Sequence, residues 1–297
     1  MEKAVIRIGS RESALAVRQT EIVCARIREA APQVGIEIIT MGTEGDRILD
    51  RSLARIGGKG LFVKELDAAL AEGRIDLAVH SLKDMPMEEN PEYPILAYGK
   101  REDARDVLIY RSGIRQLPEH PLIGTSSRRR ELQMAALYEG CSFRGIRGNV
   151  QTRLRKLEEE GFDGVLLAAA GLKRLGMESV IGRYFSVDEM VPAAGQGILA
   201  VQGRAADERI CRLLREVDDA QSRACALAER EFIRTVGGGC TSPSAAHAQV
   251  RGEELKLTGL YYDEKSGTYH KRSVCAEMQR ARQAGEALAV CMMKHED

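Results

Sequence analysis

Short apolar segments alternate with segments of helical periodicity over the first two thirds of this 297-residue chain, and this alternation constrains the fold most strongly. Residues 5–9 form an apolar run, and residues 13–30 follow with Leu15, Ile22 and Ile27 on one helical face. On the same grounds we expect strands at 36–41, 76–80, 107–110, 122–124, 142–146, 164–169 and 198–202, and helices at 61–72, 127–139 and 149–160. Strands that alternate with helices are typical of parallel βαβ units.

The pattern changes near residue 218. A long helix is expected as far as residue 236, and then two or three strands at 245–250, 255–261 and 268–276 and a last helix at 279–293. The expected fold is therefore α/β, with two periplasmic-binding-protein-like βαβ domains around a central cleft and a small α+β C-terminal domain. We place the domains at 1–97 with 198–217, at 98–197, and at 218–297.

Composition and charge exclude several classes of protein. Lys and Arg total 44 and Asp and Glu total 44, so the formal net charge is zero, whereas a general polyanion binder is usually basic. The chain has no tryptophan and few aromatic residues for stacking on nucleic-acid bases. No apolar stretch approaches the roughly 18 residues of a membrane span, and no signal sequence is visible. We expect a cytoplasmic protein, monomeric, with no nucleic-acid or membrane partner.

The cysteines point to one reactive position. Seven cysteines without a Cys-x-x-Cys pair, and five scattered histidines, favour neither a disulfide framework nor a metal site. Six cysteines lie in ordinary helix or strand patterns, where cysteine is usually a small buried hydrophobe. Cys240 differs because it follows Gly237-Gly238-Gly239 and precedes Thr241-Ser242-Pro243, and glycine permits close approach of another group. We interpret Cys240 as a candidate reactive or modified thiol, against the alternative of a plain loop cysteine.

Two strand-to-helix turns in the second unit are rich in hydroxyl groups and arginine. The first is Thr125-Ser126-Ser127-Arg128-Arg129-Arg130, and the second is surrounded by Arg144, Arg147, Arg153 and Arg155. Ligands of parallel α/β sheets bind beyond the carboxyl ends of the strands, where helix N-termini attract anions. Arginine also binds carboxylates bidentately. The pattern indicates a site for several carboxylates or phosphates, although a lone Arg-Arg-Arg is more often a solvated helix face.

The first unit has similar turns. Gly9-Ser10-Arg11-Glu12-Ser13 follows the first strand, and Gly57-Gly58-Lys59-Gly60 could cradle an anion on its backbone N–H groups. This second turn is not a P-loop, because Gly60 follows Lys59 where a P-loop has Ser or Thr. His80-Ser81-Leu82-Lys83-Asp84 would put a cation and a carboxylate at the end of the third strand. His80 alone is expected to be a packed core histidine.

These residues closely resemble the porphobilinogen deaminase family, also called hydroxymethylbilane synthase. The resemblance is carried by Val79–Asp84, Gly57–Leu66, Gly124–Ser127, Arg147–Val150, Ala168–Gly176, Gly195-Gln196-Gly197 and the Gly-Gly-Cys loop. These motifs run in the family's order from the first strand past Cys240. The C-terminal strands and helix match only in general character.

The resemblance implies a transferase of tetrapyrrole (haem-type) biosynthesis. It would join four porphobilinogen molecules head to tail on a dipyrromethane primer, release ammonia at each addition, and then hydrolyse off hydroxymethylbilane. The primer would be attached through a thioether to Cys240. Each porphobilinogen carries an acetate and a propionate, so the growing chain needs cations around it. The arginine-rich region from 128 to 155 supplies them.

By the same resemblance, Asp84 and Lys83 would be the catalytic residues. The Asp84 carboxylate would accept hydrogen bonds from pyrrole N–H groups, stabilise the cationic azafulvene that forms when ammonia leaves, and help to move the proton lost on coupling. Lys83 should help to keep it ionised. The residues expected to bind the cofactor are Cys240, Arg11, Ser13, Lys83, Asp84, Thr125, Ser127, Arg129, Arg130 and Arg147. Those expected to bind substrate are Arg11, Lys59, Phe62, Ser81, Ser126, Arg147, Asn149, Arg153 and Gln196.

Two departures and two alternatives stay open at this stage. The family often has a hydrophobic residue where Arg128 stands, so Arg128 is expected to face solvent, and the residues after Cys240 are more polar than usual. A non-catalytic two-lobed anion-binding protein would share the alternating pattern, but it would not need a thiol on a glycine loop. A nucleic-acid-binding regulator that uses Arg128–Arg130 is disfavoured by the neutral net charge.

Overall fold

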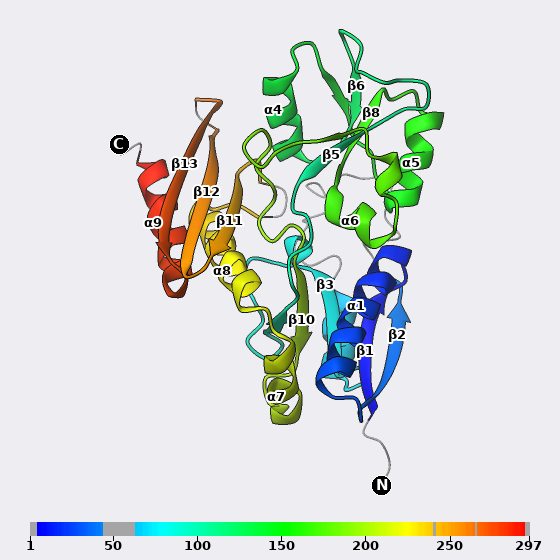
Figure 1. Ribbon diagram of the computed structural model, residues 1–297, viewed down its shortest axis with the longest axis vertical. Coiled ribbons are helices and arrows are strands. Elements are labelled where there is room, and N and C mark those ends of the chain that lie inside the picture. Colours follow the sequence, from blue (N-terminus) through cyan, green and yellow to red (C-terminus); the bar gives the residue numbers. More distant parts are fainter. Residues whose placement is uncertain (1–4, 44–62, 240–241, 265, 295–297) are drawn as a thin grey trace.

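The computed structural model describes residues 5–43, 63–239, 242–264 and 266–294. Two α/β lobes lie one above the other along the longest axis of the molecule, and a smaller unit lies beside them (Figure 1). Over these ranges no helix combines the length and the apolar character that crossing a membrane requires. The expected fold class, two βαβ lobes and a small C-terminal α+β unit, is confirmed.

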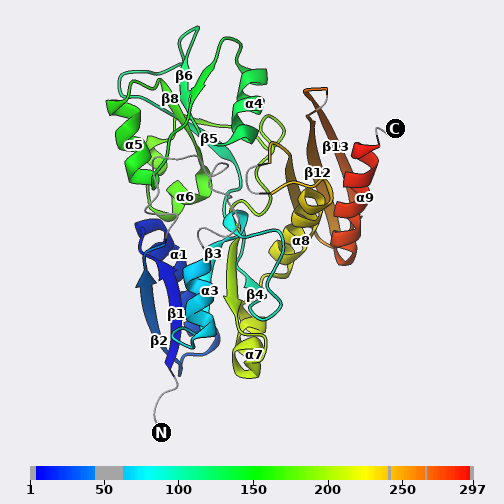
Figure 2. The same cartoon turned by 180° about the vertical axis from the view of Figure 1, so that it is seen from behind.

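The first lobe is built on a five-stranded sheet in the order β2-β1-β3-β10-β4. Its elements are β1 (Val5–Arg11), α1 (Ala14–Ala30), β2 (Gly35–Met41), α3 (Lys64–Ala71), β3 (Leu77–Ser81), the 3₁₀ turn η2 (Leu82–Asp84), β4 (Ile95–Tyr98), β10 (Leu199–Gly203) and α7 (Glu208–Val217). Strands β1, β2 and β3 are parallel, and β10 runs antiparallel to both β3 and β4. Helices α1 and α7 pack through buried apolar side chains on one face of this sheet, and α3 packs on the other face (Figure 2).

The second lobe repeats this arrangement with the order β7-β6-β8-β5-β9. Its elements are β5 (Asp106–Tyr110), β6 (Leu122–Gly124), α4 (Arg128–Leu137), β7 (Ser142–Arg144), α5 (Val150–Glu159), β8 (Gly164–Ala168), α6 (Ala169–Arg174), η3 (Glu178–Val180) and β9 (Arg183–Tyr184). Strands β6, β7 and β8 are parallel and β5 is antiparallel to β8. Each sheet therefore takes its antiparallel strand from a segment that has just crossed between the lobes, because β5 follows β4 and β10 follows β9.

The C-terminal unit is an antiparallel sheet with two helices on one face. It consists of α8 (Ala220–Thr235), β11 (Ala245–Arg251), β12 (Glu254–Asp263), β13 (Thr268–Glu277), η4 (Met278–Arg280) and α9 (Ala281–Met293). Phe232 of α8 packs into the cluster that includes Leu257 and Leu288. Gly259 has no room for a side chain, because a Cβ would lie 2.5 Å from the Phe232 ring. A Cβ at Gly285 would lie 2.3 Å from the carbonyl oxygen of Ala228, which explains the close crossing of α8 and α9.

A buried carboxylate of the C-terminal unit joins the two crossing segments. Glu229 of α8 is fully buried and accepts hydrogen bonds from both Nη atoms of Arg101 at 2.8 and 2.7 Å. It also accepts from the backbone N–H groups of Gly195 at 2.7 Å and Ala248 at 2.6 Å. Arg101 belongs to the segment between β4 and β5, and Gly195 to the segment between β9 and β10. One carboxylate thus fixes both connections between the lobes to the third unit.

Most predicted elements are confirmed, with differences at their ends and four omissions. The strand expected at 142–146 ends at Arg144, because its partner β6 ends at Gly124. The helix expected at 127–139 begins at Arg128 and ends at Leu137. Among the α-helices and strands that the structure describes, those that the sequence pattern did not predict are β4, α6, α7 and β9. The signal for α7 was present, since the Asp207 side chain caps the N–H of Ile210 and apolar residues follow at helical spacing.

Candidate functional site

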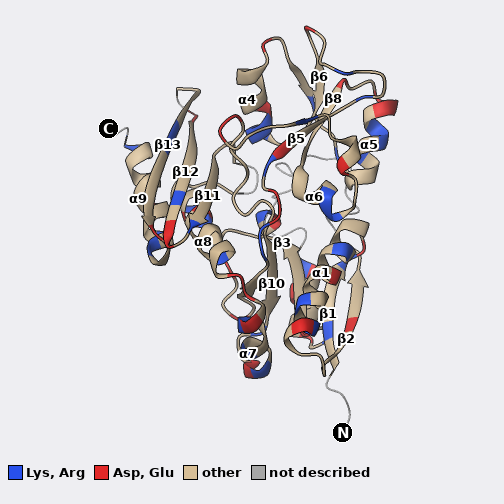
Figure 3. Ribbon diagram, viewed as in Figure 1, with Lys and Arg blue, Asp and Glu red and all other residues tan. Residues whose placement is uncertain are grey.

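The candidate site forms where strand ends of both lobes meet the crossing segments. Strand β10 is antiparallel to β3 with Leu199 opposite Ser81, so Gln196, just before β10, lies beside Lys83, just after β3. Strand β5 is antiparallel to β8 with Asp106 opposite Ala168, so Asp106 reaches the carboxyl end of the parallel strands. In Figure 3 the ribbon that leads into β5 alternates between basic and acidic residues. Chain topology alone therefore brings charged residues from distant parts of the sequence together.

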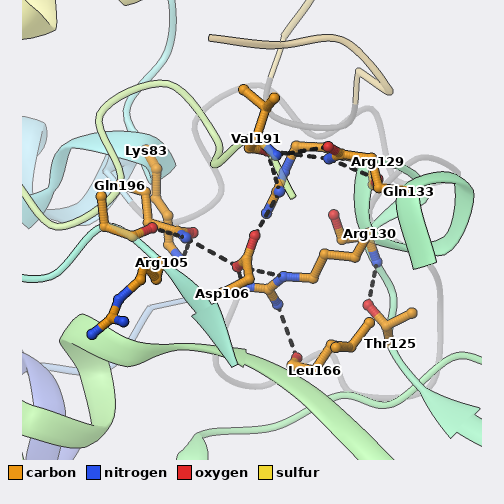
Figure 4. Close-up of polar contacts among 12 residues, drawn as sticks. Lys83, Arg105, Asp106, Thr125, Arg129, Arg130, Gln133, Leu166, Val191 and Gln196 are labelled. Atoms are coloured by element: carbon orange, nitrogen blue, oxygen red, sulfur yellow. Dashed lines mark hydrogen bonds and ion pairs between the residues drawn. The ribbon is translucent and has the colours of Figure 1, made fainter. Parts of the chain in front are cut away.

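Asp106 is the centre of a buried ionic network (Figure 4). Its side chain is fully buried, and Arg129 donates from Nη1 to Oδ2 at 2.6 Å. Arg130 donates to Oδ1 from Nε at 3.0 Å and from Nη2 at 2.8 Å. The same guanidinium groups donate to backbone carbonyls, Arg129 to Val191 at 2.7 Å and Arg130 to Leu166 at 3.0 Å. One carboxylate therefore neutralises part of the charge of two buried arginines.

Gln196 connects this network to Lys83. Its Nε2 donates to Asp106 Oδ1 at 3.0 Å and to the carbonyl oxygen of Ala104 at 2.7 Å. Its Oε1 accepts from Lys83 Nζ at 3.3 Å. Lys83 and Asp84 lie on η2, directly after β3, so the network runs from the first lobe through both crossing segments to the start of α4.

Burial and neighbouring charges perturb the cations of the site. Burial lowers the pKa of Lys83 to about 8, with a further lowering from Arg130 that Asp84 and Asp106 partly oppose. Burial also lowers the pKa of Arg153 to about 10, and here Arg130 and Arg147 lower it while Asp84 raises it. The Asp84 carboxylate thus favours the charged forms of both Lys83 of the first lobe and Arg153 of the second.

The predicted hydroxyl and amide residues hold the backbone around these cations. Ser13 Oγ accepts from the N–H of Ala16 at 3.3 Å and caps α1. Asn149 Oδ1 accepts from the N–H of Thr152 at 2.9 Å and caps α5. Thr125 Oγ1 accepts a hydrogen bond from the N–H of Ser127 at 3.2 Å, and Ser126 Oγ donates one to the carbonyl oxygen of Ile146 at 2.9 Å. Ser81 differs because its Oγ accepts from a side chain, Gln19 Nε2, at 2.9 Å.

Among the predicted arginines, Arg153 also binds the backbone, since its Nε donates to the carbonyl oxygen of Gly148 at 2.8 Å.

The remaining predicted residues fall into two groups. Arg11 ends β1, and Arg147 lies in the turn between β7 and α5, two residues before the α5 cap. Lys59, Phe62 and Cys240 lie outside the described residues.

Three expectations about single residues can be compared with the structure directly. His80 is a packed histidine, as expected: it is buried, its Nε2 lies 3.1 Å from Gln202 Oε1, and burial lowers its pKa to about 4. Arg128 faces solvent, as expected, with 56% of its side chain exposed. Arg129 and Arg130 were expected to bind ligand carboxylates, and the carboxylate that they bind here is that of Asp106.

Sequence reasoning missed Asp106 and Gln133. Gln133 Oε1 accepts from the N–H of Val191 at 2.7 Å and its Nε2 donates back to the Val191 carbonyl at 3.1 Å, which fixes the loop that Arg129 also contacts. Asp106 stands in the charged run 100–106, which is typical of an exposed turn. Its one distinguishing signal was its place at the first position of a strand, before three apolar residues.

A cavity of about 70 Å³ lies beside Met85, the residue that follows η2, and its lining also includes Val63 and Tyr93. It contacts neither Lys83 nor the arginines, so the ionic network and this cavity are separate features. Among the described residues, no group of three or more His, Cys, Asp or Glu side chains could hold a metal ion.

Comparison with known proteins gives one consistent result. Residues 6–212 match the family model "Porphobilinogen deaminase, dipyromethane cofactor binding domain", and residues 223–294 match "Porphobilinogen deaminase, C-terminal domain". A porphobilinogen deaminase of Ruminiclostridium josui is 52% identical over 270 residues, which is 91% of each chain. One of Acetivibrio thermocellus is 48% identical over 292 residues, 98% of this chain and 99% of that protein. With both family models matched and relatives aligned over nearly their whole lengths, this chain belongs to the porphobilinogen deaminase family.

Proposed function

We propose that this enzyme joins four porphobilinogen molecules head to tail on a dipyrromethane primer attached through a thioether to Cys240, releases ammonia at each addition, and then hydrolyses off hydroxymethylbilane. The family assignment supports the reaction class. The single observation that carries the proposal is the position of Asp84 on η2, directly after Lys83, which Gln196 joins to the buried network of Asp106, Arg129 and Arg130. A carboxylate among cations suits a reaction in which a substrate rich in carboxylates develops positive charge.

The described donors fit a dipyrromethane. Two linked porphobilinogen units carry four carboxylates, and buried carboxylates must meet cations or hydrogen-bond donors. Lys83, Arg129, Arg130 and Arg153 outnumber Asp84 and Asp106 at the site. The capped N-termini of α1 and α5 and the start of α4 add partial positive charge. When bound, dipyrromethane would supply the pyrrole carbon to which the first porphobilinogen is joined, and each later unit would be joined to the unit added before it.

Asp84 is the proposed catalytic residue. Its carboxylate accepts hydrogen bonds from pyrrole N–H groups and stabilises the cationic centre that a porphobilinogen forms when its ammonia leaves. It also helps to take up the proton that the coupling releases. Lys83 holds an acetate or propionate beside it, and charged hydrogen bonds of this kind typically contribute about 1.5–3 kcal/mol each.

The remaining parts of the proposal concern binding and organisation. Cofactor contacts come from Cys240, Arg11, Ser13, Lys83, Asp84, Thr125, Ser127, Arg129, Arg130 and Arg147, and substrate contacts from Arg11, Lys59, Phe62, Ser81, Ser126, Arg147, Asn149, Arg153 and Gln196. The domains are 1–97 with 198–217, 98–197, and 218–297. The enzyme acts in the cytoplasm as a monomer, with porphobilinogen as its small-molecule partner.

Intact-mass spectrometry combined with turnover tests the function and the attachment together. The purified protein should be heavier than its sequence by one dipyrromethane and should release ammonia from porphobilinogen. Cys240→Ser should have the bare sequence mass and no turnover. Cys275→Ser, which changes an exposed cysteine of the C-terminal sheet, is the matched control and should behave like the unaltered protein. Active enzyme with an unmodified mass would disprove the attachment.

The same two measurements test Asp84. Asp84→Ala should keep the added mass and lose nearly all turnover, because the positive charge that forms as ammonia leaves loses its counter-ion. Asp188→Ala, whose side chain is 81% exposed and pairs with Lys271, should keep both mass and turnover. Near-normal turnover of Asp84→Ala would remove Asp84 from the catalytic role.

A further inference from the structure

Asp106 occupies the donors of two arginines that the proposed function assigns to ligand binding. All three nitrogens of the Arg130 guanidinium donate to protein acceptors, Nε and Nη2 to Asp106 and Nη1 to Leu166. Arg129 divides Nη1 between Asp106 and Val191. The exposed fractions of the two side chains are only 4% and 8%. Neither arginine is therefore a free, solvated cation that waits for a ligand.

The charge balance at this place requires a carboxylate. Arg129 and Arg130 are adjacent in sequence and both buried, and burying two like charges together is very costly unless an opposite charge meets them. Asp106 meets both, and Gln196 carries the contact on to a third cation, the half-buried Lys83. Asp106 cancels one of the three positive charges, so the cluster keeps a net positive charge for an anionic ligand.

We propose that Asp106 is a positioning residue of the enzyme: its buried carboxylate fixes Arg129, Arg130 and, through Gln196, Lys83, and so allows three cations to gather where porphobilinogen carboxylates bind. The inference rests on the proposed function. Asp106 does not touch the reacting atoms in this scheme and acts through the cations that it holds.

Lys83 gives this role a measurable signature. The charged groups that act on it are Arg129 and Arg130 of α4, Asp84 of η2, and Asp106 of β5. Asp106 is one of the two carboxylates that raise the pKa of Lys83 against the effect of burial and of the arginines. Removing its charge should lower that pKa below its value of about 8, so Lys83 would lose its proton at a lower pH.

The test is the pH profile of kcat/KM for porphobilinogen in Asp106→Asn, which keeps the shape of the side chain and removes its charge. The alkaline limb should move to lower pH by about one unit, and KM at neutral pH should rise about tenfold. Lys83→Arg, whose side chain does not titrate in this range, should abolish the limb and so assign it to Lys83. Asp103→Asn is the matched control, since Asp103 lies on the same segment but pairs with Arg105 and should leave the profile in place.

The outcomes separate this inference from the proposed function. An unaltered enzyme that forms no hydroxymethylbilane would overturn the function. An active unaltered enzyme together with a folded Asp106→Asn variant of unchanged profile and KM would overturn only the positioning role. If Asp106→Asn does not fold, Gln196→Met replaces it: cutting the contact between Asp106 and Lys83 should move the alkaline limb of kcat/KM to lower pH, which the loss of a substrate contact alone would not do. An alkaline limb in its original place in Gln196→Met would then refute the role.

Discussion

Two fully buried carboxylates, Asp106 and Glu229, organise different regions of the molecule in different ways. Glu229 binds one arginine and two backbone N–H groups, so its cluster carries no excess charge. Asp106 binds two arginines and, through Gln196, approaches a lysine, so its cluster stays positive. The comparison indicates that a buried ion pair without net charge can join chain segments, whereas a buried cluster with a net positive charge can also attract an anion.

The two regions also contain groups that titrate in different pH ranges. Burial lowers the pKa of His247 to about 4, although the Glu229 carboxylate, whose Oε1 lies 3.7 Å from its Nδ1, opposes this shift. Lys83 lies beside the Asp106 cluster with a pKa lowered to about 8. The stability of the Glu229 cluster is therefore expected to change at acid pH, and the charge of the candidate site at alkaline pH.

The largest effect should come from Glu229→Ala. This change leaves the Arg101 guanidinium, which is only 15% exposed, without its carboxylate, and breaking a buried pair typically costs about 3–5 kcal/mol. The free energy of unfolding, measured by urea denaturation, should fall by that amount. Glu21→Ala removes the exposed pair with Arg18 and should cost about 0–1 kcal/mol. A Glu229→Ala variant as stable as Glu21→Ala would show that the Glu229 cluster is not a stabilising feature.

A smaller effect should follow from acid titration of the Glu229 cluster. His247 has a pKa of about 4 when folded and 6.5 as a free group, so the unfolded chain binds more protons between these values. Its contribution to stability is present above pH 6.5 and is lost as the pH falls towards 4, and it amounts to about 3 kcal/mol. The groups that act on His247 are Glu229, Arg101 and Asp188.

Urea denaturation of His247→Asn across this pH range provides the measurement. The variant should lose less stability between pH 6.5 and 4 than the unaltered protein does. His120→Asn, which changes an exposed histidine, should keep the original slope. Equal slopes for all three proteins would mean that His247 does not couple folding to protonation.

The smallest effect should come from Arg128→Ala, although Arg128 belongs to the same Arg-Arg-Arg run as the two buried arginines. Its side chain is 56% exposed and pairs with Glu131 across one helical turn, at 3.3 Å. Stability should change by less than about 0.5 kcal/mol and KM should stay the same. Arg129→Ala, in contrast, removes a partner of Asp106 and should raise KM. Equal KM values for Arg128→Ala and Arg129→Ala would contradict different roles for the exposed and the buried arginines of this run.

Local pattern predicted most of the fold, because apolar periodicity is a property of neighbouring residues. It also pointed to Lys83 and Asp84 at the end of β3 and to the arginines at the start of α4. It could not identify Asp106 as the partner of those arginines, because sheet topology, not sequence spacing, brings residue 106 to residues 129 and 130. Glu229 was equally hidden, since a glutamate within Ala-Glu-Arg-Glu is typical of a solvated helix face.

The place of β10 in the first sheet has a consequence for the order in which the chain acquires its structure during synthesis. In the described sheet β4 pairs with β10 alone, and β10 ends at Gly203. The second lobe has all five of its strands once residue 184 has left the ribosome, whereas the first lobe, although made earlier, still lacks its fourth strand. The N-terminal lobe is therefore the later of the two to complete its sheet, because about a hundred residues are synthesised between β4 and its partner β10.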